Sequence, residues 1–142
     1  MPIDLSTFDT ATRSAQGVKM IIRKPGSNEP FLDENRREAY IVLRGRNSPQ
    51  FLAVKRKLDL EAATRRKFAV DMTDEDRQRE TAEYLTACTV EFGNLTNGAN
   101  PLEATPENCN LVWSDQRWEW LHRQAEAFIA TDLNFLASAS AA

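Results

Sequence analysis

The C-terminal third of the chain carries a long stripe of apolar residues at helical spacing. Short oxygen-bearing side chains at Ser114 and Asp115 stand where a helix would start, because they can accept hydrogen bonds from the free first-turn amides. The pattern predicts a helix beginning near Asp115, and its apolar face must be covered by the fold or by a partner. The stripe comprises Trp113, Trp120, Leu121, Ala125, Phe128, Ile129, Leu133 and Leu136.

Two segments near the N-terminus alternate apolar and polar residues with the period of half-buried strands. They are residues 18–24 and residues 38–45, the second rich in β-branched and aromatic side chains. Between them, Pro25 presets φ for the first corner of a turn and Gly26 tolerates positive φ at the second. We expect the two segments to pair as an antiparallel β-hairpin over residues 17–47.

Three cap-like starts predict the helices that follow. They are Ser48 before Pro49, Thr73 with Asp76, and Thr105 before Pro106. A capping hydroxyl satisfies a free amide, and proline in the first turn gives up an amide that had no partner. Thr73 and Asp76 resemble a capping box. The helix after Thr73 is expected to carry Tyr84, Leu85, Cys88 and Phe92 on one face.

These elements predict an α+β fold that is mostly α, with a small N-terminal antiparallel β-hairpin followed by three or four packed helices. With 142 residues the chain fits a single domain with its own hydrophobic core. We expect an N-terminal arm over residues 1–16, the hairpin over 17–47, the helical part over 48–136 and a frayed, low-complexity tail over 137–142.

Composition limits the classes of partner. The chain has 18 Lys and Arg against 21 Asp and Glu, so no global positive field attracts nucleic acid or anionic lipid. No apolar run approaches the roughly 20 residues that span a bilayer. Cys88 and Cys109 have apolar neighbours in a chain without a secretory signal, which predicts buried, reduced thiols and a cytoplasmic location rather than a disulfide.

No constellation of residues predicts an enzyme, a metal site or a cofactor. Hydrolytic triads and zinc sites need more partners than the single histidine, His122, offers, and we expect it to be exposed or half-packed. Cys88 and Cys109 lack the spacing that presents two metal ligands from one element. We therefore assign no catalytic, cofactor-binding or metal-binding residue.

Two basic clusters, residues 55–57 and 65–67, recur at nearly the same azimuth of one predicted helix. Such an arrangement could follow a phosphate backbone. However, acidic residues interrupt the surface, and no aromatic side chain is interleaved as a stacking platform. A solvated face or a docking face for an acidic protein is therefore favoured over nucleic acid.

The order of several motifs resembles a known family. Ile-Val-Leu-Arg-Gly-Arg-Asn-Ser at 41–48 precedes a basic helix, Leu-Thr-Ala-Cys-Thr-Val follows at 85–90, and Phe-Ile-Ala-x-x-x-Asn-Phe-Leu closes the pattern at 128–136. Over residues 17–136 the chain is similar to tail assembly chaperones of long-tailed bacteriophages and prophages, which are encoded between the major tail protein and the tape measure protein.

This resemblance implies a non-enzymatic role in the host cytoplasm. The family holds the long tape measure protein until the tail tube polymerises around it, so the expected partners are the tape measure protein and the major tail protein. Apolar grooves would supply the binding. A ring or stacked homo-oligomer would suit a protein that coats a rod. The candidate contact residues are Trp118, Trp120, Phe128, Arg65, Arg66 and Lys67.

Two other classes stay open at this point. One is a structural component that remains in the virion, such as a tail completion, tail-tube or neck subunit. The other is a nucleic-acid-binding regulator, whose binding through the basic helix would depend steeply on salt.

Overall fold

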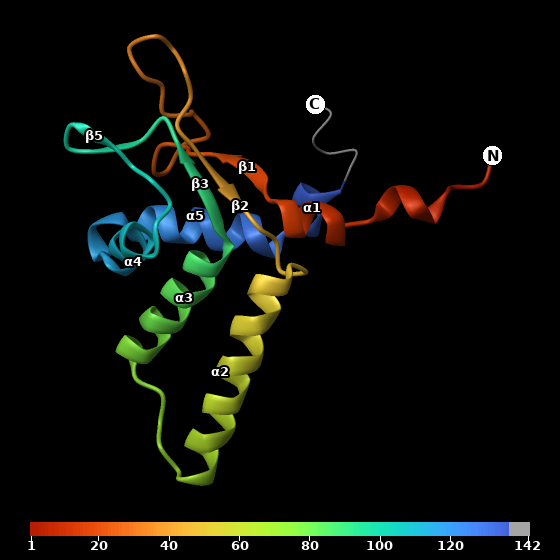
Figure 1. Cartoon of the computed structure of the whole chain (residues 1–142), viewed down its shortest axis with the longest axis vertical. Helices are drawn as coiled ribbons and strands as arrows, with labels where there is room; N and C mark the ends of the chain where they lie inside the picture. Colours follow the sequence, from red (N-terminus) through yellow and green to blue (C-terminus); the bar gives the residue numbers. More distant parts are fainter. Residues whose placement is uncertain (137–142) are drawn as a thin grey trace.

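The computed structural model describes residues 1–136, which form a mixed fold of helices and small antiparallel sheets (Figure 1). The main sheet contains β1 (Val18–Ile21), β2 (Tyr40–Leu43) and β3 (Thr89–Gly93), and a second sheet pairs β4 (Thr96–Asn97) with β5 (Asn100–Pro101). The helices are α1 (Ala11–Gln16), α2 (Pro49–Lys67), α3 (Asp74–Cys88), α4 (Pro106–Ser114) and α5 (Glu119–Ala130). The tail expected over residues 137–142 lies outside the described range.

The main sheet differs in detail from the expected hairpin. β1 and β2 are antiparallel, with Val18 opposite Leu43, but β2 is the central strand because β3 pairs with its other edge. The third strand was not predicted from the sequence. Phe92, expected on the face of the third helix, belongs instead to β3, since α3 ends at Cys88.

The turn predicted between the first two strands is confirmed. The amide of Ser27 donates to the carbonyl of Lys24 at 3.0 Å, and Gly26 has φ +73°. The rest of the connection, residues 22–39, runs irregularly beside the strands and contributes two isolated β-bridges. This connection also forms one wall of the candidate site described below.

The three predicted helix starts are confirmed by hydrogen bonds. Ser48 and Thr105 each accept a bond from the amide three residues on, at 3.2 Å in both cases. Thr73 and Asp76 exchange both bonds of a capping box, at 3.1 and 3.0 Å. These contacts join residues three positions apart, so they can be predicted directly from the sequence.

The long C-terminal helix predicted from the apolar stripe is divided into separate elements. Trp113 belongs to α4, and the backbone extends at Asp115, whose carboxylate caps a short 3₁₀ helix, η2 (Gln116–Trp118). α5 begins only at Glu119, and η3 (Asp132–Phe135) follows it. Leu133, expected in the stripe, is 64% exposed, whereas Phe135 is buried.

The core lies where the main sheet meets α3, α4 and α5. Its buried members include Met20, Ile22, Ile41 and Leu43 from the sheet side, Leu85 and Cys88 from α3, Val112 and Trp113 from α4, and Leu121, Ala125 and Ile129 from α5. The α2–α3 helical hairpin projects away from this core, with α2 packed along α3 (Figure 1). Leu58 is the buried residue of α2.

The N-terminal arm is only partly free. Leu5–Phe8 form a 3₁₀ helix, η1, that buries none of its residues and is capped by Asp4. By contrast, α1 docks on the core, because Ser14 is buried and its carbonyl accepts a hydrogen bond from the amide of Gly45 at 3.0 Å. Within residues 1–136, none of the helices combines the length and apolar composition that crossing a bilayer requires.

Candidate protein-binding site

A largely apolar cavity of about 350 Å³ opens on the surface beside the main sheet. The 22–39 connection, the β3–β5 region and the junction between α4 and α5 form its walls. The lining residues are Ile22, Phe31, Ala39, Phe92, Leu95, Thr96, Asn97, Leu102, Leu111, Val112, Trp118, Trp120 and Leu121. Trp118 and Trp120, expected as contact residues, are thus brought together.

The break before α5 positions both tryptophans. Because the chain turns at Asp115, Trp118 ends the 3₁₀ helix and Trp120 stands in the first turn of α5. The Trp120 ring packs against the ring of Phe31, with centroids 5.7 Å apart. Phe31 comes from the distant 22–39 connection, so this aromatic pair closes one side of the cavity by a tertiary contact.

A charged pair supports Trp118. The Arg117 guanidinium lies 4.9 Å from the Trp118 ring centroid and contacts Asp115 at 2.7 Å. Hydrogen bonds from Arg117 hold the pKa of the Asp115 carboxyl below its usual value. The pair therefore stays ionised near neutral pH, and the cation over the ring adds an electrostatic attraction to the apolar contact.

Phe128 lies apart from the two tryptophans. It lines another hollow together with Lys24, Gln124 and Asn134, and its ring packs edge-on against Phe135 with centroids 5.6 Å apart. The structure therefore does not join Phe128 to the tryptophan-lined cavity.

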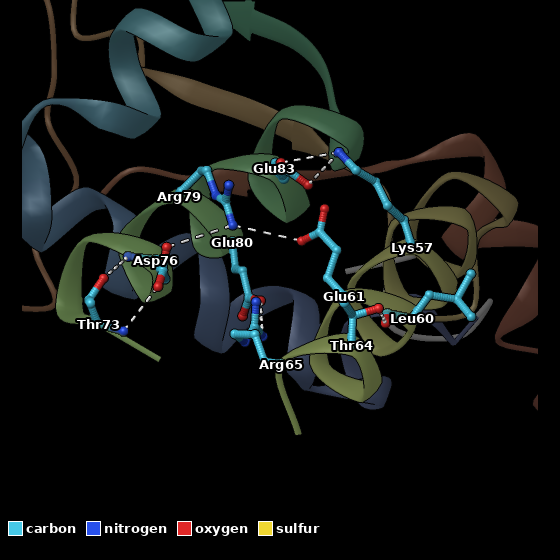
Figure 2. Close-up of polar contacts among 10 residues, drawn as sticks. All are labelled: Lys57, Leu60, Glu61, Thr64, Arg65, Thr73, Asp76, Arg79, Glu80 and Glu83. Carbon is cyan, nitrogen blue, oxygen red and sulfur yellow. Dashed lines mark hydrogen bonds and ion pairs between the residues drawn. The ribbon is translucent and has the colours of Figure 1, made fainter. Parts of the chain in front are cut away.

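The basic residues of the proposed contact set have different environments. Arg65 is turned toward α3 and binds Glu80 at 3.2 Å, and both side chains are only 18% exposed (Figure 2). Arg66 and Lys67 are exposed at the end of α2. Arg65 consequently connects the two helices, whereas its two neighbours face solvent.

Further ion pairs join α2 to α3. Figure 2 shows Lys57 directed toward Glu83, at 3.2 Å, and Arg79 placed between Glu61 and Asp76, at 3.7 and 3.9 Å. These pairs are partly exposed, and each contributes little alone, but together they fix the register of the hairpin. Of the two basic clusters, only Lys57 and Arg65 are used in ion pairs between the helices within the described part of the chain, and Lys55 pairs with Asp59 within α2.

His122 is a core residue, which corrects the expectation that it is exposed or half-packed. It is 7% exposed, and its Nε2 lies 2.7 Å from the carbonyl oxygen of Val112. Since a carbonyl only accepts, Nε2 carries the proton and joins α5 to α4. The ring also packs edge-on against Trp113.

Both cysteines are buried and free, as predicted. Burial raises the pKa of the Cys88 thiol to about 12 and also raises the pKa of Cys109. Within residues 1–136, no three His, Cys, Asp or Glu side chains come together in a group that could hold a metal ion.

Sequence reasoning missed several walls of this cavity. Phe31, Leu95 and Leu102 are isolated apolar residues within segments rich in turn-forming residues, where no periodicity marks them. Their size could have indicated a contact, because a large apolar side chain in a polar loop is often covered by another part of the fold. The sequence does not show that they converge.

The described residues therefore define a mixed helix and sheet domain with a tryptophan-lined apolar cavity on its surface. Comparison of the chain with protein-family models, with curated proteins and with solved structures finds no match.

Proposed function

We propose that this chain is a tail assembly chaperone that binds a tape measure protein in the host cytoplasm before the tail tube forms. The order of motifs over residues 17–136 suggests the family. The tryptophan-lined cavity carries the proposal, because its partly buried walls, which include Trp118, Trp120 and Phe31, offer an amphipathic helical client apolar surface beside the packed core.

The cavity suits reversible holding of such a client. Trp118, Trp120 and Phe31 provide rigid aromatic walls, and aromatic side chains of this kind dominate the energy of protein interfaces. A cavity of about 350 Å³ has room for a few apolar side chains from one face of a client helix. A chaperone that releases its client during tube polymerisation needs many weak contacts of this type, and copies joined in an oligomer would hold one client more tightly than a single copy.

The direct test is co-expression with a tape measure protein from the same phage or prophage genome. We expect the tape measure protein to stay soluble and to co-purify with the chain, and we expect quantitative mass spectrometry to find the chain in infected-cell lysate but not in purified virions. A fixed copy number in virions would instead assign the chain to the structural components of the tail or neck.

Variants test the cavity itself. Trp118→Ala and Trp120→Ala should each weaken binding of the tape measure protein about tenfold or more, as expected for aromatic anchors. Phe8→Ala is the matched control, because it removes an exposed aromatic ring from the N-terminal arm. If folded tryptophan variants bind as tightly as the control, the cavity is not the contact site.

A further inference from the structure

Helix α2 is unusually uncovered for its length. It runs from Pro49 to Lys67, and α3 packs along one side of it while the other sides face away from the domain (Figure 1). Leu58 is its buried residue. A helix in a folded protein gains most of its stability from burying one face. The face of α2 opposite α3 is therefore available to contact a partner.

The outer side of α2 carries an exposed stripe that combines apolar and basic residues. Successive members are three or four positions apart, so they lie on one face of the helix. Leu60 is 71% exposed and Leu52 is 40% exposed. The α2 outer stripe consists of Leu52, Arg56, Leu60, Ala63 and Lys67.

The charge of this stripe is not compensated within the chain. The other α2 cations are paired, Lys55 with Asp59, Lys57 with Glu83 and Arg65 with Glu80. Across residues 1–136, no carboxylate lies within ion-pair distance of Arg56, Lys67 or the adjacent Arg66. The stripe therefore presents positive charge and bare apolar surface together.

We propose that the α2 outer stripe docks an amphipathic helix of a partner protein whose apolar face is flanked by carboxylates. Arg56 and Lys67 are three helical turns apart, about 16 Å at 1.5 Å per residue. A partner helix with acidic residues at that separation would pair with both cations while its apolar side chains cover Leu60. The cations and the exposed leucines of the stripe would then both favour binding of the same kind of helix.

The stripe fits this partner better than it fits phosphate or a second copy. Leu52 and Leu60 gain nothing from a phosphate backbone, and none of the stripe residues is an aromatic platform for a base. A two-fold contact between copies would place the basic stripe against itself, which like charges disfavour. The docking surface also lies outside the tryptophan-lined cavity, because none of the cavity-lining residues belongs to α2.

The experiment is a selection of displayed helical peptides on the immobilised full chain. The peptides share a leucine stripe, and their flanking positions are randomised among Asp, Glu, Lys, Arg, Gln and Ser. We expect enrichment of Asp and Glu at positions about three turns apart. The best peptide should bind about tenfold more weakly to the Arg56→Gln, Arg66→Gln, Lys67→Gln triple variant and to Leu60→Ser.

Matched control variants test whether peptide binding depends on the stripe itself. The triple variant Lys19→Gln, Arg23→Gln, Arg36→Gln removes the same number of charges from exposed positions outside α2 where the cations likewise form no ion pair with any described residue, and Leu133→Ser removes an exposed leucine from η3. Both should bind the peptide like the wild type. Thermal melts confirm that all variants are folded, since every substituted side chain is exposed.

Several results would overturn the proposal. These are enrichment of basic or neutral flanks, no enrichment, or equal binding by the stripe and control variants. Binding of labelled duplex DNA that only the α2 triple variant loses would assign the stripe to nucleic acid. A dimer in sedimentation that only Leu60→Ser dissociates would assign it to a second copy.

Discussion

The indole N–H of Trp113 donates to the hydroxyl of Thr89 at 2.9 Å, and that hydroxyl donates in turn to the carbonyl of Leu85 at 2.6 Å. Trp113 is 1% exposed and Thr89 is the first residue of β3. One buried hydroxyl therefore joins α4 to the point where α3 ends and the third strand begins.

Thr89→Val should destabilise the protein by about 1–3 kcal/mol, because it keeps the shape but leaves the buried indole N–H without an acceptor. Urea denaturation followed by tryptophan fluorescence measures the change. Thr89→Ser keeps the hydroxyl and should cost less. A valine variant as stable as the wild type would show that the indole finds another acceptor.

Gly45→Ala should destabilise the protein by about 1–3 kcal/mol through overpacking. A Cβ at this position would clash with the Ser14 side chain and lie 3.2 Å from the Phe135 ring. In a double-mutant cycle, Ser14→Gly should cost less in the Gly45→Ala background than in the wild type, because it removes the clashing atoms. Strictly additive effects would contradict this origin.

Neither thiol should react with a disulfide reagent at pH 8 while the protein is folded. The raised pKa of Cys88, about 12, leaves almost no thiolate, and the pKa of Cys109 is raised as well. Stopped-flow labelling should detect two thiols only at the rate of unfolding. Rapid labelling of one thiol without loss of circular dichroism would contradict the packing described for α3 and α4.

Asp76 should make stability depend on pH in the acid range. Hydrogen bonds from Thr73 lower the pKa of the Asp76 carboxyl below 3.8, so the folded state favours the ionised form. The contribution is therefore complete above that value and is lost as the pH falls through the folded-state pKa. In urea titrations, Asp76→Asn should weaken the acid dependence. Glu75→Gln removes a neighbouring carboxylate that does not bond to Thr73, and it should change the acid dependence of stability less.

The local features of the fold could be predicted from the sequence, and the features that depend on distant contacts could not. The caps at Ser48, Thr73 and Thr105 involve residues three positions apart, so their chemistry is visible in the chain. β3 was missed because its pairing partner, Tyr40–Leu43, lies far away in the sequence.

The long C-terminal helix shows how periodicity can mislead. Trp113 and Trp120 are seven residues apart, a helical repeat, although the chain extends at Asp115 between them. The same break creates the candidate site, since it places Trp120 against Phe31 and Trp118 in the wall of the same cavity. The tryptophans were predicted as contact residues, but the cavity that joins them depends on a tertiary arrangement that no local pattern encodes.

The α2–α3 hairpin is inserted between two strands that are neighbours in the sheet, and its two ends meet where the amide of Arg44 donates to the carbonyl of Cys88 at 2.7 Å. In topological terms it is an elongated loop between paired strands. Both helices can therefore gain or lose whole turns near the 68–73 connection without moving a strand. The number of turns in the hairpin therefore sets the distance over which it reaches from the domain.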